Sequence, residues 1–84
     1  MYKNVLIENI DKIHTTEMGV KRISKNLDIN GDVVNYCVSK LKKDESKVTK
    51  KGKNYYVEVD DCIITVNASS FTIITAHKQW MKWK

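Results

Sequence analysis

The sequence contains no proline, and no stretch of linker-like composition separates one part of the chain from another. No apolar run approaches the ~20 residues that a helix needs to cross a bilayer. Glu8 and Asp11 interrupt the N-terminal segment where a signal peptide would carry its apolar stretch. With 84 residues, the chain is long enough for one modest hydrophobic core. We therefore predict a single cytoplasmic domain, residues 1–84, with no membrane segment.

Cysteine and arginine are scarce. Cys37 and Cys62 are too few for a disulfide scaffold and lack the spacing of a metal motif. Each falls on an apolar periodic face, so we expect two small buried hydrophobic side chains. Arg22 is the only arginine, which argues against bidentate reading of bases in a DNA major groove. Two histidines without supporting ligands predict no metal site, and we expect no cofactor.

Lysine is abundant and unevenly distributed. Residues 40–53 contain seven lysines against two acidic residues, whereas residues 54–77 contain three acidic residues and no lysine or arginine. Residues 78–84 form a second basic segment, a tail in which three lysines alternate with Trp80 and Trp83. Such segments attract RNA or another polyanion. A lysine-rich loop that only aids solubility explains the same composition, and both interpretations stay open.

The first half of the chain has a helical period, which predicts two or three helices between about residues 4 and 43. Thr15-Thr16-Glu17 provides a hydroxyl cap followed by an acid in the first turn of one helix. Asn30-Gly31-Asp32 is a turn that can cap the next helix. Gly19 lies inside a helix, where glycine costs about 1 kcal/mol relative to alanine, so we expect close packing to require it.

After residue 45 the period becomes two, which predicts four strands between about residues 47 and 77. A two-residue turn at Asp60-Asp61 places the apolar residues of the two central strands on one face. A three-residue loop at 68–70 adds Thr72, Ile74 and Ala76 to that face, as a half-buried antiparallel sheet requires.

The predicted fold class is therefore α+β. Two or three N-terminal helices pack on one face of a four-stranded antiparallel β-meander, and the other face of the sheet is left open.

The residues with useful chemistry fall on that open face. His77 can act as general acid or base near neutral pH, with Glu58 as its counterpart, and these two are the predicted catalytic residues. Aromatic stacking on a base and cationic contacts to phosphate complete the parts needed for RNA binding or metal-independent RNA cleavage. The predicted substrate-binding residues are Tyr56, Thr65, Thr75, Lys51 and Lys53.

The same face also receives apolar residues. Ile63, Phe71 and Ile73 predict cover by a protein partner, by a second copy of the chain, or by the tail with Trp80 and Trp83. The alternative function is therefore a non-enzymatic interaction module or homodimer that uses this face. Alternatively, the tail contacts nucleic acid, because its tryptophans alternate with lysines. A third hypothesis is nucleic-acid binding without catalysis, which would depend strongly on salt.

Four segments resemble a family of small bacterial proteins of unknown function, and the resemblance extends over nearly the whole chain. These segments are residues 13–19, 52–57, 64–67 and 73–78. Because that family is uncharacterised, the resemblance implies no activity.

Residues 73–77, with the sequence Ile-Ile-Thr-Ala-His, are also similar to a strand-ending motif of the nuclease superfamily that groups barnase, EndoU, colicin nucleases and RelE toxins. This weaker resemblance implies a ribonuclease-like, toxin-like protein whose open sheet face holds RNA. Thr75 and His77 would be its catalytic or substrate-binding residues. The near absence of arginine departs from RelE-type toxins.

Overall fold

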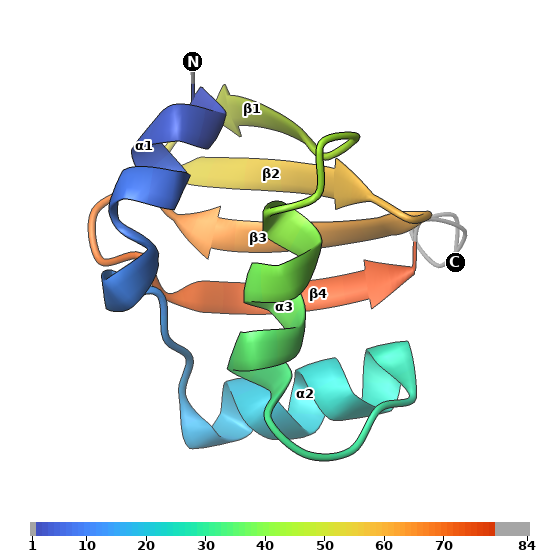
Figure 1. Cartoon of the computed structure of the whole chain (residues 1–84). Helices are drawn as coiled ribbons and strands as arrows, with labels where there is room; N and C mark the ends of the chain where they lie inside the picture. The colour runs from blue at the N-terminus through green and yellow to red at the C-terminus, as the bar shows by residue number, and fades with distance from the viewer. Residues whose placement is uncertain (1, 79–84) are drawn as a thin grey trace.

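Three α-helices precede a four-stranded antiparallel sheet (Figure 1). The computed structural model describes residues 2–78. The elements are α1 (Tyr2–Glu8), a short 3-10 turn η1 (Ile10–Lys12), α2 (Glu17–Leu27), α3 (Val33–Leu41), β1 (Lys47–Lys51), β2 (Asn54–Val59), β3 (Cys62–Asn67) and β4 (Ile73–Lys78). The strand order is β1-β2-β3-β4, so the predicted α+β meander with N-terminal helices is confirmed. Lys78 ends β4, and the rest of the predicted tail lies outside the described residues.

The helices are not equivalent in their relation to the sheet. Figure 1 shows α1 and α3 in front of one face, whereas α2 runs alongside the edge strand β4. The segment before α2 also bonds to that edge, because His14 N–H donates to Phe71 O (3.2 Å) and Ile73 N–H donates to His14 O (2.7 Å). An unpaired strand edge invites association with other chains, and this segment covers part of the β4 edge.

The start of α2 explains its internal glycine. Thr16 is the N-cap, and its hydroxyl accepts a hydrogen bond from Gly19 N–H at 3.0 Å. The Thr15 hydroxyl donates to Ile73 O at 2.8 Å, which joins α2 to β4. A Cβ on Gly19 would collide with that same Thr15 oxygen. The predicted need for close packing at Gly19 is therefore confirmed.

The central hairpin follows the predicted register. Val59 pairs with Cys62 across the turn, and the pairing continues regularly to the other end of β2 and β3. Asp60 and Asp61 have φ of 51° and 61°. A two-residue type I′ turn requires positive φ at both positions, and aspartate tolerates this region better than most residues.

β4 departs from the predicted register. Thr65 pairs with Thr75 and Val66 pairs with Ile73, so Ile74 has no counterpart on β3. One extra residue on a strand is a β-bulge, which resets the alternation of side chains. As a result Ile73 is buried in the core with 1% exposure, whereas Ile74 is 38% exposed. The predicted positions of these two isoleucines were wrong.

The loop before β4 also differs from prediction. Phe71 was expected on the open face, but its side chain packs against the core cluster. Its φ of 58° lies in the left-handed region. This conformation turns the chain before β4 begins, so alternation counted from the strand does not extend to Phe71.

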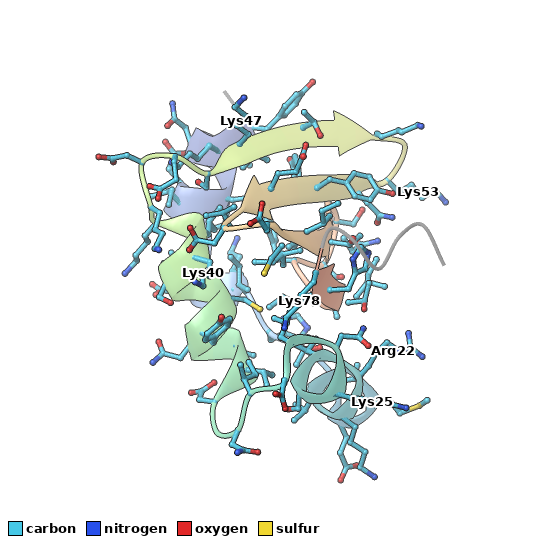
Figure 2. All side chains as sticks on the ribbon, turned by 90° about the vertical axis from the view of Figure 1, so that its right-hand side faces the viewer. Arg22, Lys25, Lys40, Lys47, Lys53 and Lys78 are labelled. Carbon is cyan, nitrogen blue, oxygen red and sulfur yellow. The ribbon has the colours of Figure 1, made fainter. Side chains whose placement is uncertain are left out.

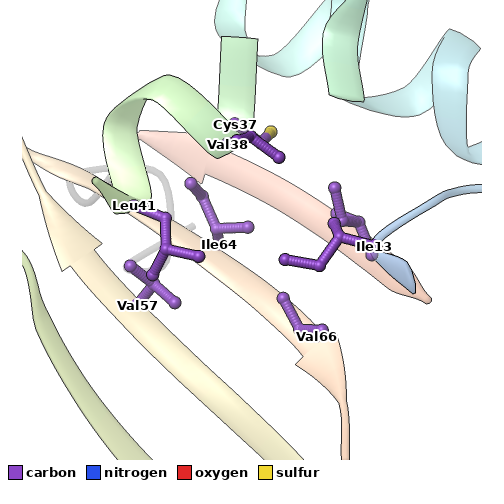
Figure 3. A pocket seen from close by; sticks show the side chains of 8 residues that line it. Ile13, Cys37, Val38, Leu41, Val57, Ile64 and Val66 are labelled. Carbon is purple, nitrogen blue, oxygen red and sulfur yellow. The ribbon is translucent and has the colours of Figure 1, made fainter. Parts of the chain in front are cut away.

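The core lies between α3 and the sheet. Figure 3 shows Cys37 and Leu41 on α3 beside Val57 and Ile64, around an apolar void of about 10 Å³. A void of that size has room for at most about one water molecule, and a void lined only by apolar groups stays dry. Burial raises the pKa of the Cys37 thiol to about 12. Both cysteines are free and buried, as predicted.

The packing at Gly19 can be tested by substitution. Helix propensity alone favours Gly19→Ala by about 1 kcal/mol, but the added methyl displaces the Thr15 hydroxyl from Ile73, and such overpacking costs about 1–3 kcal/mol. We expect Gly19→Ala to lower the free energy of unfolding in urea. The double variant with Thr15→Ala should be less destabilised than the sum of the two single variants. A Gly19→Ala protein more stable than the parent would contradict this account.

Asp60 provides a pH test. Hydrogen bonds from Lys40 (2.8 Å) and Lys43 (2.6 Å) hold the pKa of its carboxyl below the ordinary value. A lowered carboxyl pKa contributes stability above the unfolded pKa of about 3.9 and loses it as the pH falls through the folded pKa. Below about pH 4, the midpoint temperature of thermal unfolding should therefore fall less steeply with decreasing pH in Asp60→Asn than in the parent.

Asp61→Asn is the matched control for that experiment. Asp61 occupies the same turn, with a similar φ, and makes no ion pair among residues 2–78. Its variant should keep the acid dependence of the parent. Identical profiles for Asp60→Asn and Asp61→Asn would refute a role for the ion pairs.

Candidate functional site

The face of the sheet opposite α1 and α3, called here the open face, carries two rows of aligned side chains. The strand registers define both rows. The first row is Lys47, Glu58, Ile63 and His77, and the second is Thr49, Tyr56, Thr65 and Thr75. The register of β4 places His77 opposite Ile63 and Thr75 opposite Thr65. Glu58 and His77 thus flank one isoleucine in a single row.

A hollow of about 420 Å³ occupies this face. Its lining residues are Thr49, Lys51, Tyr56, Glu58, Ile63, Thr65 and His77. The floor is formed by β3, on which Ile63 and Thr65 are 9% and 8% exposed. Lys51 and Glu58 are exposed at the rim. The hollow thus combines a half-apolar floor with charged groups at its rim.

Most of the predicted site residues meet in this open-face hollow. The structure brings together the two predicted catalytic residues and three predicted substrate-binding residues: His77, Glu58, Tyr56, Thr65 and Lys51. Thr75 lies beside Thr65 on the same face but does not line the hollow. Lys53 lies in the turn after β1 and is also outside the lining.

The three residues predicted as an alternative interface do not share one surface in the structure. Ile63 forms part of the floor of the hollow. Ile73 belongs to the core, and Phe71 packs against it, because the bulge and the left-handed residue before β4 reset the alternation. Among residues 2–78, the open face therefore holds far less apolar surface than predicted.

The two histidines have different surroundings. His77 Nδ1 lies 3.1 Å from Lys78 O, and a carbonyl only accepts, so Nδ1 carries the hydrogen and Nε2 of the neutral ring can accept a proton. His14 uses both ring nitrogens, with Nδ1 donating to Lys12 O (2.8 Å) and Nε2 accepting from Thr72 Oγ1 (3.1 Å). His14 thus serves the β4 edge, whereas His77 lines the hollow.

The lysine side chains of the basic segment 40–53 lie on different surfaces of the molecule. Lys40 lies on α3 (Figure 2). Lys40 and Lys43 both form ion pairs with Asp60. On β1, Lys51 lines the hollow, whereas Lys50 pairs opposite Tyr55 on the helix-facing side. Only part of the predicted basic segment can therefore hold an anion on the open face.

No cluster of three or more His, Cys, Asp or Glu side chains within residues 2–78 is arranged to hold a metal ion. In the same part of the chain, no helix has the length and apolar character to cross a membrane.

Comparison with known proteins identifies one family, and the function of that family is unknown. A family model described as a protein of unknown function, DUF3781, matches residues 7–77. The chain belongs to the DUF3781 family. No curated protein and no solved structure matches it. The predicted membership of an uncharacterised family is confirmed, and nothing in these comparisons supports the nuclease resemblance.

The part of the chain that matches the DUF3781 family includes all seven residues that line the open-face hollow. Sequence reasoning missed one of them, Thr49. The signal was present, because Gly52 has a φ of 63° and marks a two-residue turn that pairs Lys51 with Asn54. Alternation from that turn places Thr49 beside Tyr56.

Proposed function

We propose that this DUF3781 protein binds single-stranded RNA in the open-face hollow and cleaves it without a metal ion. The observation that supports the proposal is the lining of the hollow, which combines an imidazole, a carboxylate, a phenol and an ammonium group. Acid, base, stacking surface and phosphate partner are the four parts that RNA cleavage uses.

Binding would depend on Tyr56 and Lys51. The Tyr56 ring offers a surface for stacking an unpaired base, which contributes about 1–3 kcal/mol per base in single-strand binding proteins. Lys51 at the rim supplies a point charge for a phosphate. The hydroxyls of Thr49 and Thr65 lie in the same row as Tyr56 and can bond the sugar or the base edge.

Cleavage would depend on the row that contains Glu58 and His77. They stand two strands apart, so their Cα atoms are separated by about 10 Å. In an in-line displacement, acid and base each approach an oxygen on opposite sides of phosphorus to about 3 Å, so two groups that span the phosphate are required. Side chains that lean inward over Ile63 meet this requirement.

The protein takes one proton from the RNA and gives one proton back, so the reaction is balanced. One of the pair removes the proton of the 2′-hydroxyl, and the 2′-oxygen attacks phosphorus. The bond to the 5′-oxygen breaks, and the other group protonates that oxygen. The products are a 2′,3′-cyclic phosphate and a 5′-hydroxyl.

A protein partner or second copy on the same face is the alternative. It rested on Ile63, Phe71 and Ile73, and the structure leaves only Ile63 on this face among the described residues. The polar lining of the hollow therefore favours the RNA proposal.

Cleavage is tested with purified protein and a single-stranded RNA oligonucleotide labelled at one end. We expect His77→Ala and Glu58→Gln each to lower the rate by about 100-fold or more, because each removes one half of the proton transfer. Products should carry the cyclic phosphate, which mass spectrometry detects.

His14→Asn is the matched control, since it removes the other imidazole of the protein without touching the hollow. Its rate should equal that of the parent once folding is verified by circular dichroism. Equal rates for the parent and His77→Ala would reveal a contaminating nuclease. No cleavage by the parent removes the catalytic part of the proposal and leaves binding to be tested separately.

Binding is tested with two adjacent lysines on opposite faces of β1. Lys51→Ala should weaken binding of a uridine oligonucleotide and lower the slope of log affinity against log salt by about 0.7, the value for one phosphate contact on a single strand. Lys50→Ala has the same charge change on the other face and should leave the slope near that of the parent. Fluorescence anisotropy across a salt series measures both. Equal effects of the two variants would mean that attraction is nonspecific.

A further inference from the structure

A second patterned surface lies on α2, outside the open-face hollow. Met18 is 70% exposed, which is unusual for a large apolar side chain. Lys21, Arg22 and Lys25 follow it at helical spacings of three, four and seven residues, so all four side chains share one face of the helix. Figure 2 shows Arg22 and Lys25 on α2 at the lower end of the molecule.

Two shallow hollows meet at this face. One of about 390 Å³ is lined by Met18, Lys21, Arg22, Lys25 and Asn26. The other, of about 300 Å³, is lined by Thr16, Met18, Gly19, Arg22, Thr72, Ile73 and Ile74. Both include Met18 and Arg22, so the two hollows adjoin at these side chains; together they are called here the α2–β4 groove.

The bulge in β4 supplies the apolar wall of this groove. Ile74 is the residue without a counterpart on β3, and it is 38% exposed where it faces α2. Bulges re-aim side chains and occur next to functional surfaces. Met18 and Ile74 thus place a flexible thioether and a branched aliphatic group on opposite sides of the groove.

Within the described part of the chain, the cations of the groove pair with no acidic side chain. Among residues 2–78, Lys21, Arg22 and Lys25 form no ion pair, in contrast to Lys40 and Lys43, which share Asp60. Glu17 begins α2 and Asp28 follows its end, but neither lines either hollow. The groove therefore presents net positive charge around an apolar centre.

We propose that the α2–β4 groove binds an acidic segment of a partner protein that carries an apolar side chain between its carboxylates. Arg22 offers a fork that matches a carboxylate in two hydrogen bonds, and methionine adapts to apolar partners of varied shape. A symmetric pairing of this groove with the same groove of a second copy does not fit, since two basic surfaces repel each other. Nucleic acid is disfavoured, because phosphates gain nothing from Met18 and Ile74.

The probe is a short fluorescent peptide in which glutamates flank two leucines. It is compared with a peptide in which serines replace the two leucines, and with a uridine oligonucleotide. We expect the leucine peptide to bind the full-length protein about tenfold more tightly than the serine peptide. In ¹H–¹⁵N spectra it should shift the amides of α2 and of Ile74. The oligonucleotide should leave those amides unchanged.

Variants assign the binding to the groove. Ile74→Thr and Arg22→Gln should each weaken the leucine peptide about tenfold, while Val20→Thr and Lys42→Gln change it less than about twofold. Val20 is a matched control because its exposure, 38%, equals that of Ile74, and it points away from Met18, two residues before it. RNA binding by Ile74→Thr should be unchanged, which separates this proposal from the RNA proposal.

Three results would overturn the inference. The first is equal affinity for the leucine and serine peptides, which would mean that charge alone acts. The second is that the oligonucleotide displaces the peptide from the groove, as the amide signals of α2 would report, which would make the groove a nucleic-acid surface. The third is equal loss of affinity in Ile74→Thr and Val20→Thr.

Discussion

Both polar groups of the Ile73 backbone form hydrogen bonds to the segment before α2, and the rest of the structure depends on this attachment. Its N–H donates to His14 O at 2.7 Å, and its carbonyl accepts from the Thr15 hydroxyl at 2.8 Å. Its side chain is buried in the core. These contacts anchor the first residue of β4 before the strand pairs regularly with β3. Because Thr15 is committed to Ile73, the helix that follows must carry glycine at position 19.

The anchored residue and the bulge beside it determine what the two surfaces contain. With Ile73 in the core and Ile74 extra, Thr75 and His77 fall on the open face. His77 then aligns with Glu58 across Ile63, which creates the row on which the RNA proposal rests. The same extra residue turns Ile74 toward α2, which creates the apolar wall of the α2–β4 groove. One irregularity in one strand thus supplies a part of both candidate sites.

Much of this fold is predictable from residues that are neighbours in the chain. Period, caps and two-residue turns act over a few residues, and they predict the helices, the strands and the β2–β3 register correctly. For this reason the sequence correctly predicted that one face of the sheet carries Tyr56, Glu58 and Thr65. The position of Ile73 was not predictable in this way, because it depends on burial of its side chain and on hydrogen bonds to His14 and Thr15, almost sixty residues earlier.

The sequence by itself determined the elements, their order, the buried cysteines and the face that carries the polar side chains, since each follows from local backbone preference and alternation. Only the tertiary structure decided the register of β4, the place of α2 beside that strand, and hence which residues share the hollow and which share the groove. The physical reason is that a bulge has little local signature. It forms where the hydrogen bonds of a distant segment and the burial of one isoleucine together stabilise it more than regular pairing would.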